Sequence, residues 1–252
     1  MSSQRSSGNR VISSANDLVE AARDESVSEI VVKGDLFELP SIRLRPGQTL
    51  RGADEQPRLA FVAGIDGLQV SSDNRVQNLH VQVSPDRRAI FNDTDVENPG
   101  RIELRNVTTI GRVQLLGRGK VGGGHIEVDG LDILSADARG ETDRPHGYGV
   151  YVLQGAFTLW NMQPEDEIVM GAELTNISVG RSGAPVLGSG VFVSGAGDKG
   201  GRLTVRRLEA NGVYSDGKIP AGTPDQITGG VFIGGHCRCR LSKTHFVRTS
   251  DF

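Results

Sequence analysis

Short apolar runs, separated by polar and glycine-rich stretches, recur along the chain. Three of them begin with glycine and carry an aromatic third residue, at 149–152, 190–193 and 230–233, with about forty residues between copies. A repeat of this length is typical of a solenoid, in which each copy forms a strand that stacks on the next. Strand alternation then turns two residues of each copy toward the interior. These interior positions are Val150, Val152, Val191, Val193, Val231 and Ile233.

Other apolar runs fill the rest of the chain at a similar or shorter spacing. Ile102 and Leu104 recur as Ile126 and Val128. Strands this short need neighbours, and the gaps between them are too short and too polar for crossover helices. We therefore expect a coil of parallel strands, from which polar insertions project as loops. The further runs are 29–34, 42–44, 48–52, 67–70, 76–83, 89–91 and 201–205, and the insertions are 135–147, 161–171, 194–200 and 214–228.

One helix is predicted, at residues 13–24. Ser13 or Ser14 can cap it, Asp17 and Glu20 favour its positive end, and Leu18 lies on its apolar face. Residues 1–10 are expected to form a disordered polar arm and 11–235 a single domain. Residues 236–252 contain both cysteines and no glycine. For this last segment two alternatives stand: a final poor strand at 240–247, or a truncated chain with an open coil.

The helix, the run Glu-Ile-Val-Val-Lys-Gly-Asp-Leu and the run Ile-Arg-Leu-Arg-Pro-Gly-Gln-Thr-Leu-Arg-Gly together resemble the entrance of the pectate-lyase-like right-handed parallel β-helix superfamily. The match is detailed over residues 11–52, and beyond them only the spacing of the apolar runs matches. The resemblance implies an all-β right-handed parallel β-helix whose N-terminal helix plugs the first coil. The alternative fold is a β-sandwich, which accounts less well for the helix and the period.

Charge and composition narrow the range of functions. The chain has 28 basic and 31 acidic side chains, so nothing in its total charge indicates nucleic acid or an anionic membrane as a partner. No apolar run is long enough to span a bilayer, and the first ten residues lack the apolar core of a secretory signal. A cytoplasmic location is expected by default, and the serine-rich start leaves non-classical export open.

Aromatic side chains suggest one candidate binding surface. In the glycine-led repeats, Tyr151, Phe192 and Phe232 alternate with the interior valines and should form an outward ladder, with Phe91 as a further member. Flat aromatic faces stack on sugar rings, so the ladder is a candidate substrate-binding platform. The alternative is a second hydrophobic layer, in which the inserted loops cover these rings.

Carboxylates suggest a second candidate site. Glu103 and Glu127 occupy equivalent outward positions, with Asp129 close by, and neighbouring carboxylates repel unless a cation intervenes. Lyases of the resembling superfamily hold calcium with such carboxylates and use an arginine or lysine as base beside a uronate. By that resemblance Glu103, Glu127 and Asp129 are candidate calcium ligands, and Arg105 or Arg206 is the candidate base. The alternative is a solvated face offset by Arg101, Arg105 and Arg112.

The chain departs from the catalytic signatures of that superfamily. Residues 92–95 read Asn-Asp-Thr-Asp, which is neither the Asn-Thr-Asp of polygalacturonases nor a pectate-lyase signature. The resemblance therefore supports the fold and carries over no catalytic set. The sequence favours a polysaccharide-binding or polysaccharide-degrading protein, either a lyase or a glycoside hydrolase if it is an enzyme. The alternatives are a non-catalytic scaffold for protein interaction and an inactive, truncated relative.

Overall fold

The computed structural model of the chain consists of short parallel strands and one short helix in the part that it describes. That part comprises residues 8–53, 55–117, 123–138, 155–161, 170–180, 186–194, 203–210, 213–214, 231–234, 240–242 and 245–246. Every strand pairing within it is parallel. The all-β class and the parallel pairing expected from the sequence are thus confirmed. No helix in these ranges is long and apolar enough to cross a bilayer.

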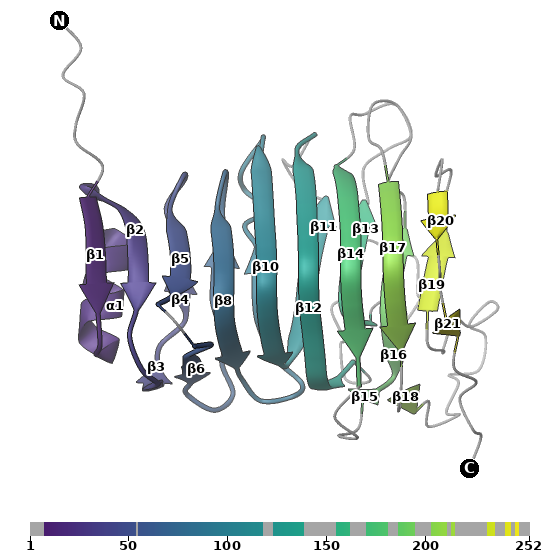
Figure 1. Cartoon of the computed structure of the whole chain (residues 1–252), viewed down its shortest axis with the longest axis horizontal. Helices are drawn as coiled ribbons and strands as arrows, with labels where there is room; N and C mark the ends of the chain where they lie inside the picture. The colour runs from purple at the N-terminus through teal and green to yellow at the C-terminus, as the bar shows by residue number, and fades with distance from the viewer. Residues whose placement is uncertain are drawn as a thin grey trace, which may run out of the picture.

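The predicted helix is present as α1 (Ala15–Arg23), at the N-terminal end of the strands (Figure 1). Ser14 caps it, and its side-chain oxygen accepts a hydrogen bond from the backbone N–H of Asp17 at 3.2 Å. Leu18, Ala21 and Ala22 are buried and face the strands. The helix therefore covers apolar side chains that the first strands would otherwise expose to water.

The larger sheet runs through the molecule from its N-terminal to its C-terminal end, with its strands side by side (Figure 1). Its main path is β1 (Gly8–Ile12), β2 (Val27–Val32), β5 (Thr49–Gly52), β8 (Arg75–Gln82), β10 (Arg101–Ile110), β12 (His125–Asp137), β14 (Gly171–Val179), β17 (Leu203–Ala210) and β20 (Arg240–Ser242). Shorter strands extend it: β3 (Leu36–Leu39), β6 (Arg58–Phe61), β15 (Val186–Leu187), β18 (Val213–Tyr214) and β21 (His245–Phe246).

A second sheet is built from the segments that lie between these strands in sequence. Its order is β4 (Ile42–Arg43), β7 (Leu68–Val70), β9 (Arg88–Asn92), β11 (Arg112–Gly117), β13 (Gly155–Asn161), β16 (Ser189–Ser194) and β19 (Val231–Gly234). From β7 to β14 the chain alternates strictly between the two sheets. Each passage adds one strand to each sheet, and both sheets grow in the direction of the sequence.

The core consists of apolar columns in which each residue lies beside its counterpart on the next strand. One column of the larger sheet contains Ile30, Leu50, Val76, Leu104, Val128, Leu174 and Val205, each at most 1% exposed. The predicted equivalence of Ile102 and Leu104 with Ile126 and Val128 is confirmed by this register. Each such side chain contributes about 1.5–3 kcal/mol when it leaves water, so the columns stabilise the stack.

Sharp corners divide the long strands of the larger sheet into two segments. Asn78, Asn106, Gly130 and Asn176 occupy the same corner position on successive strands, each with φ between 49° and 77°. Asparagine and glycine adopt this left-handed conformation with the least strain. The corner residue is skipped in the strand pairing, and the Asn106 side-chain amide donates to Asn78 Oδ1 at 2.8 Å. Residues before and after each corner therefore belong to differently oriented faces.

Two predictions about the rungs are wrong. The strand neighbour of Val191 toward the N-terminus is Phe157, not Val150, while its neighbour on the other side is Val231 as expected. Interior positions accept any apolar side chain, so the sequence similarity of 149–152 to 190–193 does not identify the neighbouring strand. Residues 149–152 themselves lie outside the described residues. In addition, residues 8–10 belong to β1 and pair with β2, although the sequence had placed them in the polar arm.

Candidate functional site

Two outward-facing columns of charged and polar side chains run across the larger sheet, on the face opposite the Leu104 column. One contains Glu29, Thr49, Arg75, Glu103, Glu127 and Glu173, and the other contains Arg51, Gln77, Arg105, Asp129, Thr175 and Arg206. Glu103 and Glu127 are thus adjacent and equivalent, as the sequence predicted. Three neighbouring glutamates would repel one another, so their partners decide what this face can do.

Glu103 is the most deeply buried carboxylate of the column. Its Oε1 accepts hydrogen bonds from Gln77 Nε2 at 2.8 Å and forms an ion pair with Arg105 Nε at 2.8 Å. Arg75 Nε lies 3.7 Å from the other carboxylate oxygen. Its charge is therefore balanced by guanidinium and amide groups of its own strand and the preceding one.

Glu127 continues this arrangement on the next strand. Arg101 is in contact with one of its carboxylate oxygens, and Arg105 Nη2 donates to the other at 2.7 Å. Burial pushes the pKa of Glu127 upward, but the hydrogen bonds from Arg101 and Arg105 outweigh it, and the pKa lies below its ordinary value. The same hydrogen bond, with the charge of Glu103, raises the pKa of Arg105. Arg105 thus bridges the two buried carboxylates.

The arginines are far more exposed than the carboxylates that they cover. The side chains of Arg75, Arg101 and Arg105 are 59%, 57% and 48% exposed, against 7% for Glu103 and 15% for Glu127. What this surface offers to solvent is therefore mainly guanidinium N–H donors. We call Arg51, Arg75, Arg101 and Arg105, on the adjacent strands β5, β8 and β10, the arginine face.

The predicted calcium site is not formed in this arrangement. Within the described ranges, no group of three or more histidine, cysteine, aspartate or glutamate side chains is placed to hold a metal ion. Glu103 and Glu127 bind arginines, and Asp129 accepts a hydrogen bond from Asn176 at 2.7 Å. The geometry favours the alternative of a charged face offset by arginines. Arg75 takes part in place of the expected Arg112, whose guanidinium donates to the Asp86 carbonyl at 3.0 Å.

The predicted bases differ in their surroundings. Arg105 is held by two carboxylates and its raised pKa makes loss of its proton harder, which is the opposite of what a general base needs. Arg206 is half exposed and lies 3.7 Å from Glu173, with no closer carboxylate among the described residues. The environment of Arg105 therefore does not favour proton abstraction.

The members of the aromatic ladder whose side chains the structure describes, Phe91 and Phe192, are buried. Phe192 is only 1% exposed, and its ring packs edge-on against Trp160 with 5.8 Å between centroids. Its neighbour toward the N-terminus is Thr158, so the expected position of Tyr151 is taken, and Tyr151 itself lies outside the described residues. Phe232 is in register with Phe192 as expected. Burial of Phe192 agrees with the alternative of a second hydrophobic layer.

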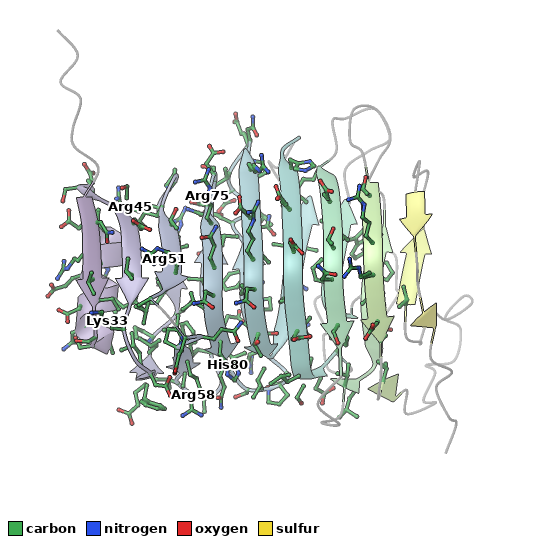
Figure 2. The ribbon with its side chains drawn as sticks, in the orientation of Figure 1. Lys33, Arg45, Arg51, Arg58, Arg75 and His80 are labelled. Carbon is green, nitrogen blue, oxygen red and sulfur yellow. The ribbon has the colours of Figure 1, made fainter. Side chains whose placement is uncertain are left out.

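Sequence reasoning missed a group of basic residues on the N-terminal strands. Lys33, Arg45, Arg51, Arg58, Arg75 and His80 are labelled in Figure 2, along the strands from β2 to β8. Arg51 pairs with Glu29 at 2.6 Å, and Arg58 lies over the Phe37 ring at 4.9 Å. Arg58 and His80 are neighbours beyond the corner at Asn78, so this part of the basic group faces a different side from the arginine face. Its signal in the sequence was the return of arginine at outward positions of successive strands.

Comparison with known proteins gave no relative for this chain. No family model matches it, and neither does any curated protein or any solved structure. The resemblance to the pectate-lyase-like superfamily therefore remains one of sequence pattern over the first strands.

Proposed function

We propose that the chain winds as a right-handed parallel β-helix and that its arginine face binds an acidic polysaccharide. The coil is supported by the strict alternation between two parallel sheets, both growing in sequence order. Right-handed winding is supported by the general rule for parallel crossovers, which holds in about 98% of cases. The stack would then present Arg51, Arg75 and Arg101 on a line that crosses the strands obliquely, because Arg75 is two residues from the partner of Arg51 and Arg101 is two residues from the partner of Arg75.

The observation that carries the binding proposal is the exposure of guanidinium groups above buried carboxylates. Arg51, Arg75 and Arg101 belong to three adjacent strands, which lie about 4.8 Å apart. A polymer with a carboxylate on each sugar can meet one guanidinium per strand, and arginine pairs with carboxylates through two parallel hydrogen bonds. Glu29, Glu103 and Glu127 pair with these guanidiniums, which reduces the conformational entropy that binding would otherwise cost.

Binding without cleavage fits this face better than catalysis does. A lyase needs a group that accepts a proton beside the uronate, whereas Arg105 has a raised pKa. A calcium-dependent enzyme needs clustered oxygen ligands, whereas these carboxylates are bonded to arginines. The lyase and the glycoside hydrolase remain predictions from the resemblance, and the assay below includes a test for a lyase.

The test compares polygalacturonate, an acidic polymer, with dextran, a neutral one, by isothermal titration calorimetry. We expect binding of polygalacturonate only, weakened by salt because exposed charges are screened. The double variant Arg75→Gln/Arg101→Gln should bind roughly five- to thirtyfold more weakly, since each exposed ion pair is worth up to about 1 kcal/mol. The same mixtures, with and without calcium, are monitored for unsaturated products, which binding alone does not release.

Arg87→Gln serves as the matched control, because Arg87 is an exposed arginine that pairs with its neighbour Asp86 and lies outside the arginine face. Equal loss in Arg87→Gln and in the double variant would contradict a specific face. Absence of binding to polygalacturonate would remove the proposal and leave the protein scaffold as the alternative. Release of unsaturated products would show that the protein is a lyase and would contradict binding without cleavage.

A further inference from the structure

A hollow of about 480 Å³ lies between α1 and β4. Val19, Pro40 and Pro46 give it its accessible apolar lining, whereas the other apolar lining residues, Ala22, Ile42 and Leu44, are at most 3% exposed. The volume lies within the range of roughly 300–1,000 Å³ that is typical of small-molecule sites. The fold thus provides an apolar hollow at its N-terminal end.

The hollow exists because β4 is the terminal strand of the smaller sheet. The N–H groups of Ile42 and Leu44 donate to the carbonyls of Gly67 and Gln69 at 3.1 and 2.9 Å, both on the side of β7. Among the described residues, no strand lies beside the opposite edge of β4. On the larger sheet, by contrast, β1 and β2 continue past this level and α1 packs against them. The helix therefore closes one side of the stack end and leaves the space beside β4.

Three arginines give the hollow a positive rim. Arg23, the last residue of α1, is exposed and has no carboxylate partner within the described part of the chain. Arg45 donates to the backbone carbonyls of Asp24 and Val27 at 2.6 and 3.0 Å, so hydrogen bonds fix its guanidinium without neutralising it. Arg43 pairs with the buried Asp93. Two of the three positive charges thus face the hollow without a paired carboxylate.

We propose that this hollow binds a small anionic amphiphile, a molecule with an apolar body and one carboxylate or sulfonate group. The body lies against Val19, Pro40 and Pro46, where it removes apolar surface from water. The acid group meets Arg23 and Arg45 in charge-assisted hydrogen bonds. A cationic amphiphile of the same size would meet these two positive charges and be repelled. A neutral one would gain the apolar contact alone.

The test uses the fluorescent sulfonate ANS as probe and three ten-carbon competitors. Decanoate should displace ANS, decanol should do so less well, and decylamine should not. Arg23→Gln should weaken binding of ANS and decanoate by roughly two- to fivefold, as expected for loss of one exposed charge-assisted contact. Val19→Glu, which places a carboxylate in the wall, should weaken both further. Arg75→Gln, on the arginine face, should leave them unchanged.

Thermal melts establish that each variant is folded before it is titrated. Unchanged binding in both Arg23→Gln and Val19→Glu would overturn the proposal, as would equal displacement by decanoate and decylamine. Arg75→Gln alters the polysaccharide titration and not the ANS titration if both proposals hold. Failure of the amphiphile site and failure of the polysaccharide face are therefore distinguishable in the same set of proteins.

Discussion

Replacement of single glutamates by glutamine along the outward column should destabilise the protein in proportion to their burial. Glu103 is the most buried, Glu127 follows, and Glu173 is 44% exposed. Glu103→Gln keeps the size and shape of the side chain but replaces its charged carboxylate with a neutral amide, which then faces the guanidinium of Arg105. A hydrogen bond to a charged group contributes about 1.5–3 kcal/mol, and a buried group left unpaired costs a similar amount. We therefore expect a loss of about 1.5–3 kcal/mol for Glu103→Gln.

Glu173→Gln is the matched control, because it makes the same change in the same column. Glu173 lies 3.7 Å from Arg206, and both side chains are about half exposed. Exposed pairs of this kind are worth about 0–1 kcal/mol. For a protein of this size, 1 kcal/mol shifts the melting temperature by about 2–4 °C, so Glu103→Gln should lower it by roughly 3–12 °C. Differential scanning calorimetry at pH 7 measures both variants, and a Glu173→Gln effect equal to that of Glu103→Gln would refute the reasoning.

The pH dependence of Glu127 adds an independent check. Its pKa in the folded protein lies below the ordinary value of 4.5, so its stabilising contribution is present above pH 4.5. The contribution is lost as the pH falls through the lower folded pKa. The difference in melting temperature between Glu127→Gln and the parent protein should therefore be largest near neutral pH and shrink below pH 4.5. A difference that stays constant with acidification would show that the charge is not responsible.

Two further predictions concern the core and the second face of the larger sheet. Leu104→Ala, in the fully buried column, should cost about 2–5 kcal/mol in urea denaturation, and a loss below about 1 kcal/mol would contradict the stacked core. Burial and the charge of Arg58 lower the pKa of His80 below 6.5, so its contribution to stability is complete above pH 6.5 and is lost as the pH falls toward the folded pKa. His80→Gln should therefore flatten the decline in melting temperature between pH 7 and pH 5.5, and an unchanged decline would contradict this role.

The architecture was predictable where local sequence signals, such as a helix cap or an alternating apolar stripe, determine the structure. The helix at 13–24, observed as Ala15–Arg23, follows from its serine cap and apolar face. The strands β2, β4, β5, β7, β8 and β9 follow from alternation between interior and surface, and the register of Glu103 with Glu127 follows from repeated neighbours. Local rules suffice here because each strand is bounded by turn residues and carries its own apolar stripe.

Among the strands that were missed, β13 and β14 have interior positions filled by different side chains. β14 pairs Ala172 with Ile126, although alanine and isoleucine share little beyond being apolar, and residue 171 had been assigned to an insertion. β13 places Phe157 beside Val191, whereas the repeated sequence pattern at 149–152 predicts Val150 at that position. A better signal was available at the corners. Asparagine or glycine stands between an outward polar residue and an inward apolar one at positions 78, 106, 130 and 176.

The candidate site could be located from the sequence but its chemistry could not. Alternation places Glu103 and Glu127 on the surface of adjacent strands, and from that position alone a metal ion is a reasonable partner. The outcome depends on which neighbouring cations can reach them, and long arginine side chains reach across strands as well as along them. Arg105 contacts carboxylates on its own strand and the next, so one residue replaces the ion that the carboxylates would otherwise need.

The same contacts link the stability of the larger sheet to the surface that it presents. Burying a carboxylate without a partner costs free energy of folding, so Glu103 needs the arginines that neutralise it. Each guanidinium has five N–H donors and Glu103 has only two oxygens, so the remaining donors stay in solvent. Because the glutamate carboxylates are paired with arginines, the remaining guanidinium N–H donors are held in fixed orientations on the surface. A surface formed in this way favours an extended anionic ligand over a metal ion, since the oxygen ligands that a metal would require are already occupied.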